Sequence, residues 1–271
     1  MATVDDVRNY WDKHPLFSHE LAEPGSREYF DQIDRIKKED VERFAMQYWD
    51  FGASRGKHVL DVGCGPGWLA VQYAQAGAHV TAVDLTPRAV ELARKHLDYR
   101  GRRATVHEGN AEQLPFADNT FDLVVSSGVL HHTPDTPRAI RECWRVLRPS
   151  GTARLTFYYK GILHSRVVFP ITRAVMRAGG VKHPGADLAR GAADVDNFIR
   201  QYDGAENPVG VGYSIAQWSE MLRAAGFIVV GYERHFFPRR FIPFRALVPR
   251  AVHHLLDATL GTMVYFTLRK Q

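Results

Sequence analysis

A glycine-rich turn that follows an apolar run contains the first residues whose types and spacing could do chemistry. Residues Val59–Gly67 have the sequence VLDVGCGPG, with glycines at positions 63, 65 and 67. Glycines in such a turn adopt positive φ and let a ligand approach the backbone closely. Asp61 lies at the entrance of the turn, where its carboxylate would repel an anionic pyrophosphate and attract a cation.

A second carboxylate, Asp84, ends the next apolar run, 21 residues after Gly63. At the end of a strand, such a carboxylate can accept two hydrogen bonds from ribose hydroxyls. A dinucleotide-binding turn would have Gly or Ala at position 68, where this chain has Trp68. The two carboxylates therefore favour a cationic ligand with a ribose over a dinucleotide, and S-adenosylmethionine has an ammonium, a sulfonium and a ribose.

With these residues the sequence resembles the class I S-adenosylmethionine-dependent methyltransferases, and most of all their small-molecule group (methyltransferase type 11), which includes quinone-biosynthesis enzymes. The resemblance covers residues 57–158 and, more loosely, 213–235. It rests on five blocks in the family's order: VLDVGCGPG at 59–67, AVDL at 82–85, EGNAEQLPF at 108–116, FDLVVSSGVLHH at 121–132 and ECWRVLRPSG at 142–151.

The resemblance implies S-adenosylmethionine as the cofactor and assigns a role to residues in each of the first four blocks. The implied cofactor-binding residues are Asp61, Gly63 and Gly65 for the methionine part, Asp84 for the ribose, Leu85, Asn110 and Ala111 for the adenine, and Ser126 near the transferring methyl group. The family usually has Asp where this chain has Asn110. An amide oxygen can still accept from the adenine amino group, but Asn110 could instead simply form a turn before a helix.

The resemblance also places His131 beside the transferring methyl group, where it could act as a general base. The alternative is that the pair His131-His132 only caps the end of a strand. We expect Tyr202 and Tyr213 to line the acceptor pocket, and Tyr10, Trp11 and His14 to close the cofactor end. Ordinary packing of the tyrosines is the competing interpretation.

Alternating strand and helix patterns after Lys57 predict the elements that would position these residues. The fold class is α/β, a doubly wound seven-stranded sheet of the Rossmann-like methyltransferase type, with N-terminal helices and a lid insertion. The expected strands are 58–62, 79–84, 103–107, 121–126, 152–158, 227–235 and 262–268. The expected helices between them are 68–76, 87–99, 137–147 and 215–225.

Four segments follow from this pattern. Residues 1–50 form an N-terminal helical cap, 51–159 the cofactor-binding core, 160–213 a lid that helps to bind substrate, and 214–271 the rest of the core with an insertion at 236–261. Because ligands bind at the carboxyl ends of the strands in such sheets, the lid and the N-terminal helices would cover that edge.

The composition excludes a disordered chain, a collagen-like repeat and a disulfide scaffold. The 271 residues are 45% hydrophobic and 24% charged, which is typical of a globular protein. Two widely separated cysteines and an acidic start without a leader-like segment favour a reduced, cytoplasmic location.

No HxxxH or CxxC spacing is present, so we expect no metal site. The oligomeric state is left open.

Residues 158–271 contain 15 basic and 8 acidic residues, a net charge of +7. Two apolar stripes lie in this basic part: one at Leu163, Val167, Val168, Ile171 and Val175, and one at Val248, Val252, Leu255, Leu256 and Leu260. Together they suggest an apolar or lipid-like acceptor and peripheral contact with a membrane surface. The alternative is that both stripes pack on the domain or on a second subunit.

We therefore expect methyl transfer from S-adenosylmethionine to a small-molecule acceptor by in-line displacement. One alternative is an RNA or DNA methyltransferase, which the basic composition favours. However, Ser126–Leu130 replaces the Asn/Asp-Pro-Pro-aromatic motif of enzymes that act on base amines, and no nucleic-acid module is appended, so nucleic acid is not the expected partner. The other alternative is a protein that binds the cofactor without catalysis.

Overall fold

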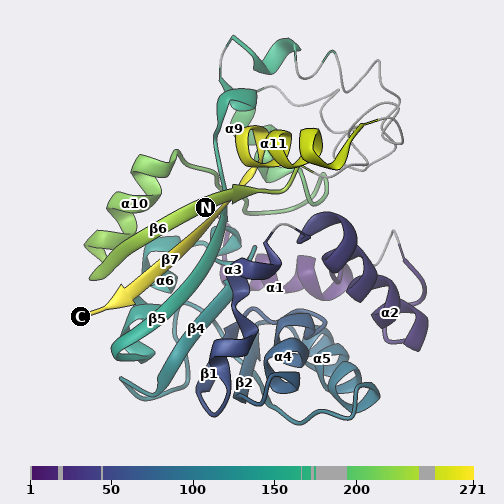
Figure 1. Ribbon diagram of the computed structural model, residues 1–271, viewed down its shortest axis with the longest axis vertical. Coiled ribbons are helices and arrows are strands. Elements are labelled where there is room, and N and C mark those ends of the chain that lie inside the picture. Colours follow the sequence, from purple (N-terminus) through teal and green to yellow (C-terminus); the bar gives the residue numbers. More distant parts are fainter. Residues whose placement is uncertain are drawn as a thin grey trace.

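The computed structural model describes residues 2–17, 21–43, 45–165, 167–171, 174, 194–237 and 248–271. At its centre is a seven-stranded sheet with the order β3-β2-β1-β4-β5-β7-β6 (Figure 1). The strands are β1 His58–Val62, β2 His79–Asp84, β3 Thr105–Glu108, β4 Phe121–Ser127, β5 Leu147–Tyr158, β6 Phe227–His235 and β7 Met263–Lys270. Strands β1 to β5 are parallel, and β7 runs antiparallel between β5 and β6.

Helices cover both faces of the sheet. They are α1 Val4–Lys13, α2 Arg27–Ile36, α3 Met46–Trp49, α4 Trp68–Gln75, α5 Pro87–Tyr99, α6 Thr136–Val146, α9 Val195–Arg200, α10 Ile215–Ala224 and α11 Arg250–Leu260. A π-helix at Lys37–Val41 (η1) and 3-10 turns at Phe51–Ser54 (η2), Leu130–His132 (η3) and Ile162–His164 (η4) complete the described elements. The predicted seven-stranded α/β fold is confirmed, with shifts of a few residues at the ends of elements.

The period-two alternation of side chains along the strands creates two cores. Val59 and Val125 point into the core on the side of α2, α4 and α5, whereas their neighbours Leu60 and Val124 point into the core with α6 and α10. Sequence signals fix where the helices begin: Thr86 accepts a hydrogen bond from the Ala89 amide at the start of α5. These packed layers hold the carboxyl ends of β1, β2 and β4 at one edge.

The described part of the predicted lid is small. Phe169, Phe198 and Ile199 form a minor core of their own. Phe198 and Ile199 belong to α9, which is part of the predicted lid. Val175 of the predicted stripe, and the basic residues that would share its helix, fall outside the described residues. The expected insertion between β6 and β7 is present, because these two strands pair as a hairpin from Phe227 to His235 while α11 lies between them in the chain.

Candidate functional site

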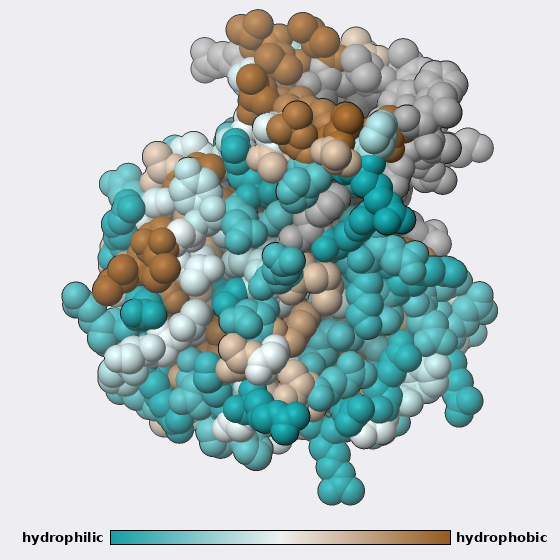
Figure 2. All heavy atoms as spheres, viewed as in Figure 1, coloured by the Kyte–Doolittle hydropathy of each residue, from teal (hydrophilic) through white to brown (hydrophobic). Residues whose placement is uncertain are grey.

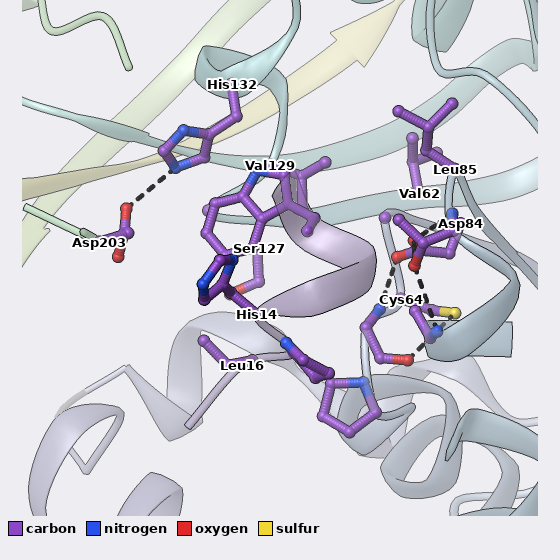
Figure 3. Close-up of a pocket in the computed structure, with 18 of the residues that line it drawn as sticks. His14, Leu16, Val62, Cys64, Asp84, Leu85, Ser127, Val129, His132 and Asp203 are labelled. Carbon is purple, nitrogen blue, oxygen red and sulfur yellow. Dashed lines mark hydrogen bonds and ion pairs between the residues drawn. The ribbon is translucent and has the colours of Figure 1, made fainter. Parts of the chain in front are cut away.

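A cavity of about 610 Å³ lies at the carboxyl edge of the sheet, a volume that suits a cofactor or substrate. It is enclosed by segments distant in sequence, which include the first helix, the glycine turn and the chain after α9 (Figure 3). The lining is drawn from residues within 7–17, 61–69, 83–92, 109–111, 127–133 and 202–206, together with Lys37, Glu42, Tyr158, Phe236 and Met263.

The three glycines of the turn between β1 and α4 have different tasks, although all have positive φ. A Cβ at Gly63 would lie 2.3 Å from the Val129 side chain, and one at Gly67 would lie 2.9 Å from Ala93 Cα. Those two glycines are therefore needed for packing. Gly65 has φ +50° and no atom within 4 Å of its Cβ position, and it lines the cavity. Only Gly65 leaves space that a ligand can use.

The side chain of Asp61 reaches the cavity wall, where one of its two oxygens lacks a hydrogen-bond partner in the described part of the chain. Its side chain is almost fully buried, and Oδ2 has no hydrogen-bond partner among the described residues. Burial, and secondly repulsion from Asp84, raise the pKa of Asp61 to about 7. A buried carboxylate without a partner is costly, so this position is prepared for a cation or a hydrogen-bond donor.

Asp84 supports the glycine turn as well as facing the cavity. Its Oδ2 accepts a hydrogen bond from the Gly65 amide at 2.9 Å, and its Oδ1 accepts one from the Thr86 amide at 3.0 Å. Burial raises the pKa of Asp84 against the opposing effect of these hydrogen bonds. Oδ1 also accepts from the Thr86 hydroxyl at 3.1 Å, whereas Oδ2 accepts only from Gly65 among the described residues, so Oδ2 can still accept from a hydroxyl group of a bound ligand.

The third block lies beside Asp84, and Leu85, Asn110 and Ala111 all line the cavity. The amide oxygen of Asn110 accepts a hydrogen bond from the Glu112 backbone amide at 2.9 Å. Asn110 thus forms the turn that was the alternative to ligand binding, while it still faces the cavity. Because an amide oxygen has two lone pairs, the two roles are compatible.

A buried ion pair at the cavity wall was not predicted from the sequence. Lys37 Nζ lies 2.8 Å from Glu42 Oε1, and Trp49 Nε1 donates to Glu42 Oε2 at 3.0 Å. Both charged side chains line the cavity and are nearly buried. The pair spans the π-helix η1, so its i,i+5 spacing differs from the i,i+4 spacing used to recognise helical ion pairs.

At the other end of the cavity, His132 forms a couple with Asp203 (Figure 3). His132 Nε2 lies 3.2 Å from Asp203 Oδ2, and its Nδ1 lies 2.7 Å from the carbonyl oxygen of Val209. The Asp203 carboxylate also accepts from the Tyr158 hydroxyl at 2.5 Å, and the Tyr10 hydroxyl donates to the Asp203 backbone oxygen at 2.5 Å. The couple is therefore held by side chains of two distant segments, α1 and the end of β5, and by the backbone of Val209.

His131, the predicted general base, lies outside the cavity lining. It is fully buried, and its Nδ1 accepts a long hydrogen bond of 3.4 Å from the Tyr158 amide. Burial, and secondly the neighbouring His132, hold the pKa of His131 well below its usual range. In the tight turn η3, consecutive side chains point in different directions, so His132 and not His131 lines the cavity.

Two other predicted residues also lie outside the lining. Ser126 is buried and donates its hydroxyl to the Val62 carbonyl oxygen at 2.9 Å, while Ser127, on the opposite face of β4, lines the cavity. Tyr213 packs against Trp218, with ring centroids 4.8 Å apart, and its backbone pairs with Tyr159. Both side chains serve the fold rather than the cavity wall.

The four remaining predicted residues, Tyr10, Trp11, His14 and Tyr202, do line the cavity, although Tyr10 and Trp11 contact the Asp203–His132 couple and not the expected cofactor end. Tyr10 and His14 stack with ring centroids 4.6 Å apart, and His14 Nδ1 lies 2.8 Å from the Tyr10 carbonyl oxygen. This contact along α1 presents both rings to the same side. Of the predicted site, therefore, all residues but Ser126, His131 and Tyr213 are brought together around one cavity.

Two further findings concern metals and membranes. Within the described ranges, no group of three or more His, Cys, Asp or Glu side chains is arranged to hold a metal ion. Among the same residues, every helix is too short or too polar to cross a bilayer.

Comparison with known proteins supports the interpretation of the central strands. Residues 60–155 match the family described as "Methyltransferase domain". A "Ubiquinone biosynthesis O-methyltransferase" of Aromatoleum aromaticum is 40% identical over 97 residues, 35% of this chain and 42% of that protein. One of the same description from Actinobacillus pleuropneumoniae is 32% identical over 146 residues, 44% of this chain and 62% of that protein. The matches thus span about half the length of these relatives.

The fold is also found in solved structures. A structure described as the [4+2]-cyclase SpnF shares 22% identity, covers 99% of this chain and 96% of its own, and has a TM-score of 0.56. At this identity the likeness concerns the fold alone. Because that protein is described as a cyclase, the reaction of this chain must be argued from its own cavity residues.

Proposed function

We propose that this protein, whose residues 60–155 match a methyltransferase domain, transfers a methyl group from S-adenosylmethionine to a hydroxyl group of a small-molecule acceptor. The observation that supports this best is that the buried carboxylate of Asp61 and the His132–Asp203 couple line the same cavity. The names of the matched relatives support oxygen as the acceptor atom.

The residues at one end of the cavity fit the cofactor. Asp61, with its unpartnered Oδ2, would bind the ammonium group, and the open space at Gly65 would admit the methionine part. Lys37, which is within the lining and near Asp61, would bind the carboxylate of the same amino acid. Asp84 would accept from a ribose hydroxyl, and Leu85 with Asn110 would border the adenine.

The charge of this cavity also suits that cofactor. Among the residues that the structure describes, five acidic side chains line it against one lysine: Glu42, Asp61, Asp84, Asp203 and Glu206, with Lys37. Such a wall favours a ligand with positive charge and disfavours a pyrophosphate. When bound, S-adenosylmethionine supplies an electrophilic methyl group, so the protein has to align the acceptor, exclude water and remove one proton.

The His132–Asp203 couple is suited to hold that proton. Nδ1 of His132 faces a carbonyl oxygen and must carry hydrogen, which leaves Nε2 as the nitrogen that can gain or lose a proton. Because Nε2 faces Asp203 Oδ2 at 3.2 Å, the proton of the acceptor hydroxyl would pass to the Asp203 carboxylate and from it to Nε2, and Asp203 then stabilises the imidazolium. Tyr10 and Tyr158 fix Asp203 through their hydroxyl groups, and Trp11 contacts the His132 ring edge-on.

The test is to incubate the protein with methyl-labelled S-adenosylmethionine and a fractionated metabolite extract, and to identify what acquires label. We expect label in a small molecule, with one S-adenosylhomocysteine formed for each methyl group transferred. Label in RNase- or DNase-sensitive material would instead support a nucleic-acid methyltransferase. Binding of the cofactor without any turnover would support a non-catalytic protein, and either result would overturn the proposal.

Two features support a reducing cytoplasmic location for this activity. Cys64 and Cys143 are both free and buried in separate cores, so neither is available for a structural disulfide. Burial raises the pKa of both thiols, which keeps them protonated and unreactive.

A further inference from the structure

Helix α11 is attached to the sheet by its polar side. The two buried side chains of this helix are His253 and Asp257. Asp257 Oδ2 lies 2.7 Å from His235 Nδ1, and its Oδ1 accepts from the Phe237 amide at 2.8 Å. His253 Nε2 lies 2.7 Å from the Phe237 carbonyl oxygen. The polar face of the helix, which would normally meet water, is therefore used for docking.

The apolar side of α11 consequently faces outward. Val252 and Leu255 are 45% and 63% exposed, although they belong to the apolar stripe recognised in the sequence. This arrangement is the reverse of an ordinary surface helix, which buries its apolar stripe. Packing on the domain, one of the two alternatives for this stripe, does not occur at these two residues.

A second exposed apolar group belongs to the segment that follows β5. Ile162, Val167 and Ile171 are 59%, 79% and 61% exposed. Figures 1 and 2 show this segment and α11 in the same lobe above the sheet, where apolar side chains gather on the surface. Exposed apolar side chains gathered in this way mark an interaction surface.

The charges of the surrounding sequence indicate the kind of partner. Residues 160–213, the predicted lid, contain seven basic and five acidic residues, and residues 236–262 contain four and one. The single acid of the second segment, Asp257, is buried against His235. Apolar side chains within basic segments complement a surface that combines anionic groups with an apolar interior. Two copies of the same basic lobe would repel each other.

We propose that the exposed side chains of α11 and of residues 162–171 form a docking face for an anionic lipid bilayer, with α11 lying in the interface. Val252 and Leu255 would enter the acyl boundary, with the exposed Arg250 of the same helix at the headgroups. The hydrogen bonds of Asp257 and His253 to the Phe237 backbone, together with the Asp257–His235 pair, form the polar clasp of α11. Phe237 is next in sequence to Phe236, which lines the cavity. Docking would therefore bring the wall of the acceptor cavity close to the membrane, whether or not the acceptor is a lipid.

The experiment is co-sedimentation of the protein with vesicles of phosphatidylcholine alone and of phosphatidylcholine with phosphatidylglycerol. We expect binding to the anionic vesicles at low salt and weaker binding at high salt. The double variant Val252→Asp/Leu255→Asp should lower binding by about 30-fold, because both burial and attraction are lost. Retained binding of S-adenosylmethionine shows that the variant is folded.

A matched control exists on another surface of the same chain. Ile228 and Val230 of β6 are 43% and 59% exposed, and they lie toward the end of the strand away from α11. Ile228→Asp/Val230→Asp should leave vesicle binding unchanged. The proposal is overturned by wild-type protein that stays in the supernatant at low salt, by equal losses in both double variants, or by a dimer that only the α11 variant dissociates.

Discussion

The two ends of the cavity are built in different ways. At the cofactor end, Asp61 and Asp84 lie at the carboxyl ends of the adjacent parallel strands β1 and β2, and the Gly65 amide, 19 residues from Asp84, donates to the Asp84 carboxylate. At the acceptor end, Asp203 is held by Tyr10, which is 193 residues away in sequence, and by Tyr158, which is 45 residues away. One end is therefore part of the sheet, whereas the other is assembled by tertiary contacts.

This difference has a mechanical consequence. The cofactor end has the stability of the sheet, because moving Asp61 or Asp84 would require the central strands to separate. The acceptor end depends on a few hydrogen bonds between α1, the end of β5 and the chain after α9. Changes at the first end should affect cofactor affinity most, and changes at the second should affect turnover with little effect on affinity.

The largest expected effect is that of Gly65→Val. Its φ of +50° and the open space at its Cβ mean that a branched side chain would stand where the ligand fits, so cofactor affinity should fall more than about 1000-fold. Gly101→Val is the matched control, because Gly101 also has positive φ and open space but does not line the cavity. If both variants lose affinity equally in a calorimetric titration, backbone strain rather than occlusion is responsible.

Next is the acceptor end, where His132→Gln should lower kcat by about 10²- to 10⁴-fold with nearly unchanged cofactor affinity. In the wild type, log kcat should rise with pH up to a plateau, since the acceptor proton has to be taken up by an unprotonated group. His131→Leu should retain that profile, because His131 is buried outside the cavity. If His131→Leu loses the rise of kcat with pH and His132→Gln keeps it, the general base is His131, as predicted from the sequence.

A smaller effect concerns Asp61, whose pKa of about 7 couples cofactor binding to pH. A cation binds the ionised form, so affinity should rise up to about tenfold per pH unit below pH 7 and stay constant above it. For the ligand-free protein the sign is opposite: a raised carboxyl pKa lowers stability as pH rises from about 4 to about 7. Asp61→Asn should lose about 30- to 1000-fold in affinity, and its affinity should no longer vary with pH in calorimetry.

The smallest expected effect is at the clasp of α11. Burial alone lowers the pKa of His235, but its hydrogen bonds to Asp257 and Glu233 outweigh burial and raise the pKa. A raised imidazole pKa adds stability that is present below about pH 6.5 and lost as pH rises through the folded-state pKa. His235→Gln should therefore cost about 1–2 kcal/mol in urea unfolding at pH 6 and less at pH 8.5. An equal cost at both pH values would contradict the clasp.

The same contrast explains how much the sequence predicts. Strand, turn and following helix are local signals, so the cofactor end follows from short blocks: Asp61, Gly65 and Asp84 were expected in the cavity wall and line it. The two-residue period of the strands likewise predicts which side chains fill each core. Local patterns suffice where the site is made of consecutive elements.

The acceptor end required information that local patterns do not contain. Ser126 and His131 were each one residue from the side chain that lines the cavity, because the strand register and the tight turn decide which neighbour points inward. Asp203 was not among the expected site residues, since its partners Tyr10 and Tyr158 are distant in sequence. The Lys37–Glu42 pair depends on a π-helix, for which no pattern was used.

The most direct test of the central claim is a calorimetric titration of the wild-type chain with S-adenosylmethionine, S-adenosylhomocysteine and NAD. The charges and open space of the cavity predict that both adenosyl amino acids bind with one-to-one stoichiometry and that NAD does not bind. Binding of NAD, with no heat from either adenosyl amino acid, would contradict the assignment of Asp61 and Asp84 to a cationic cofactor.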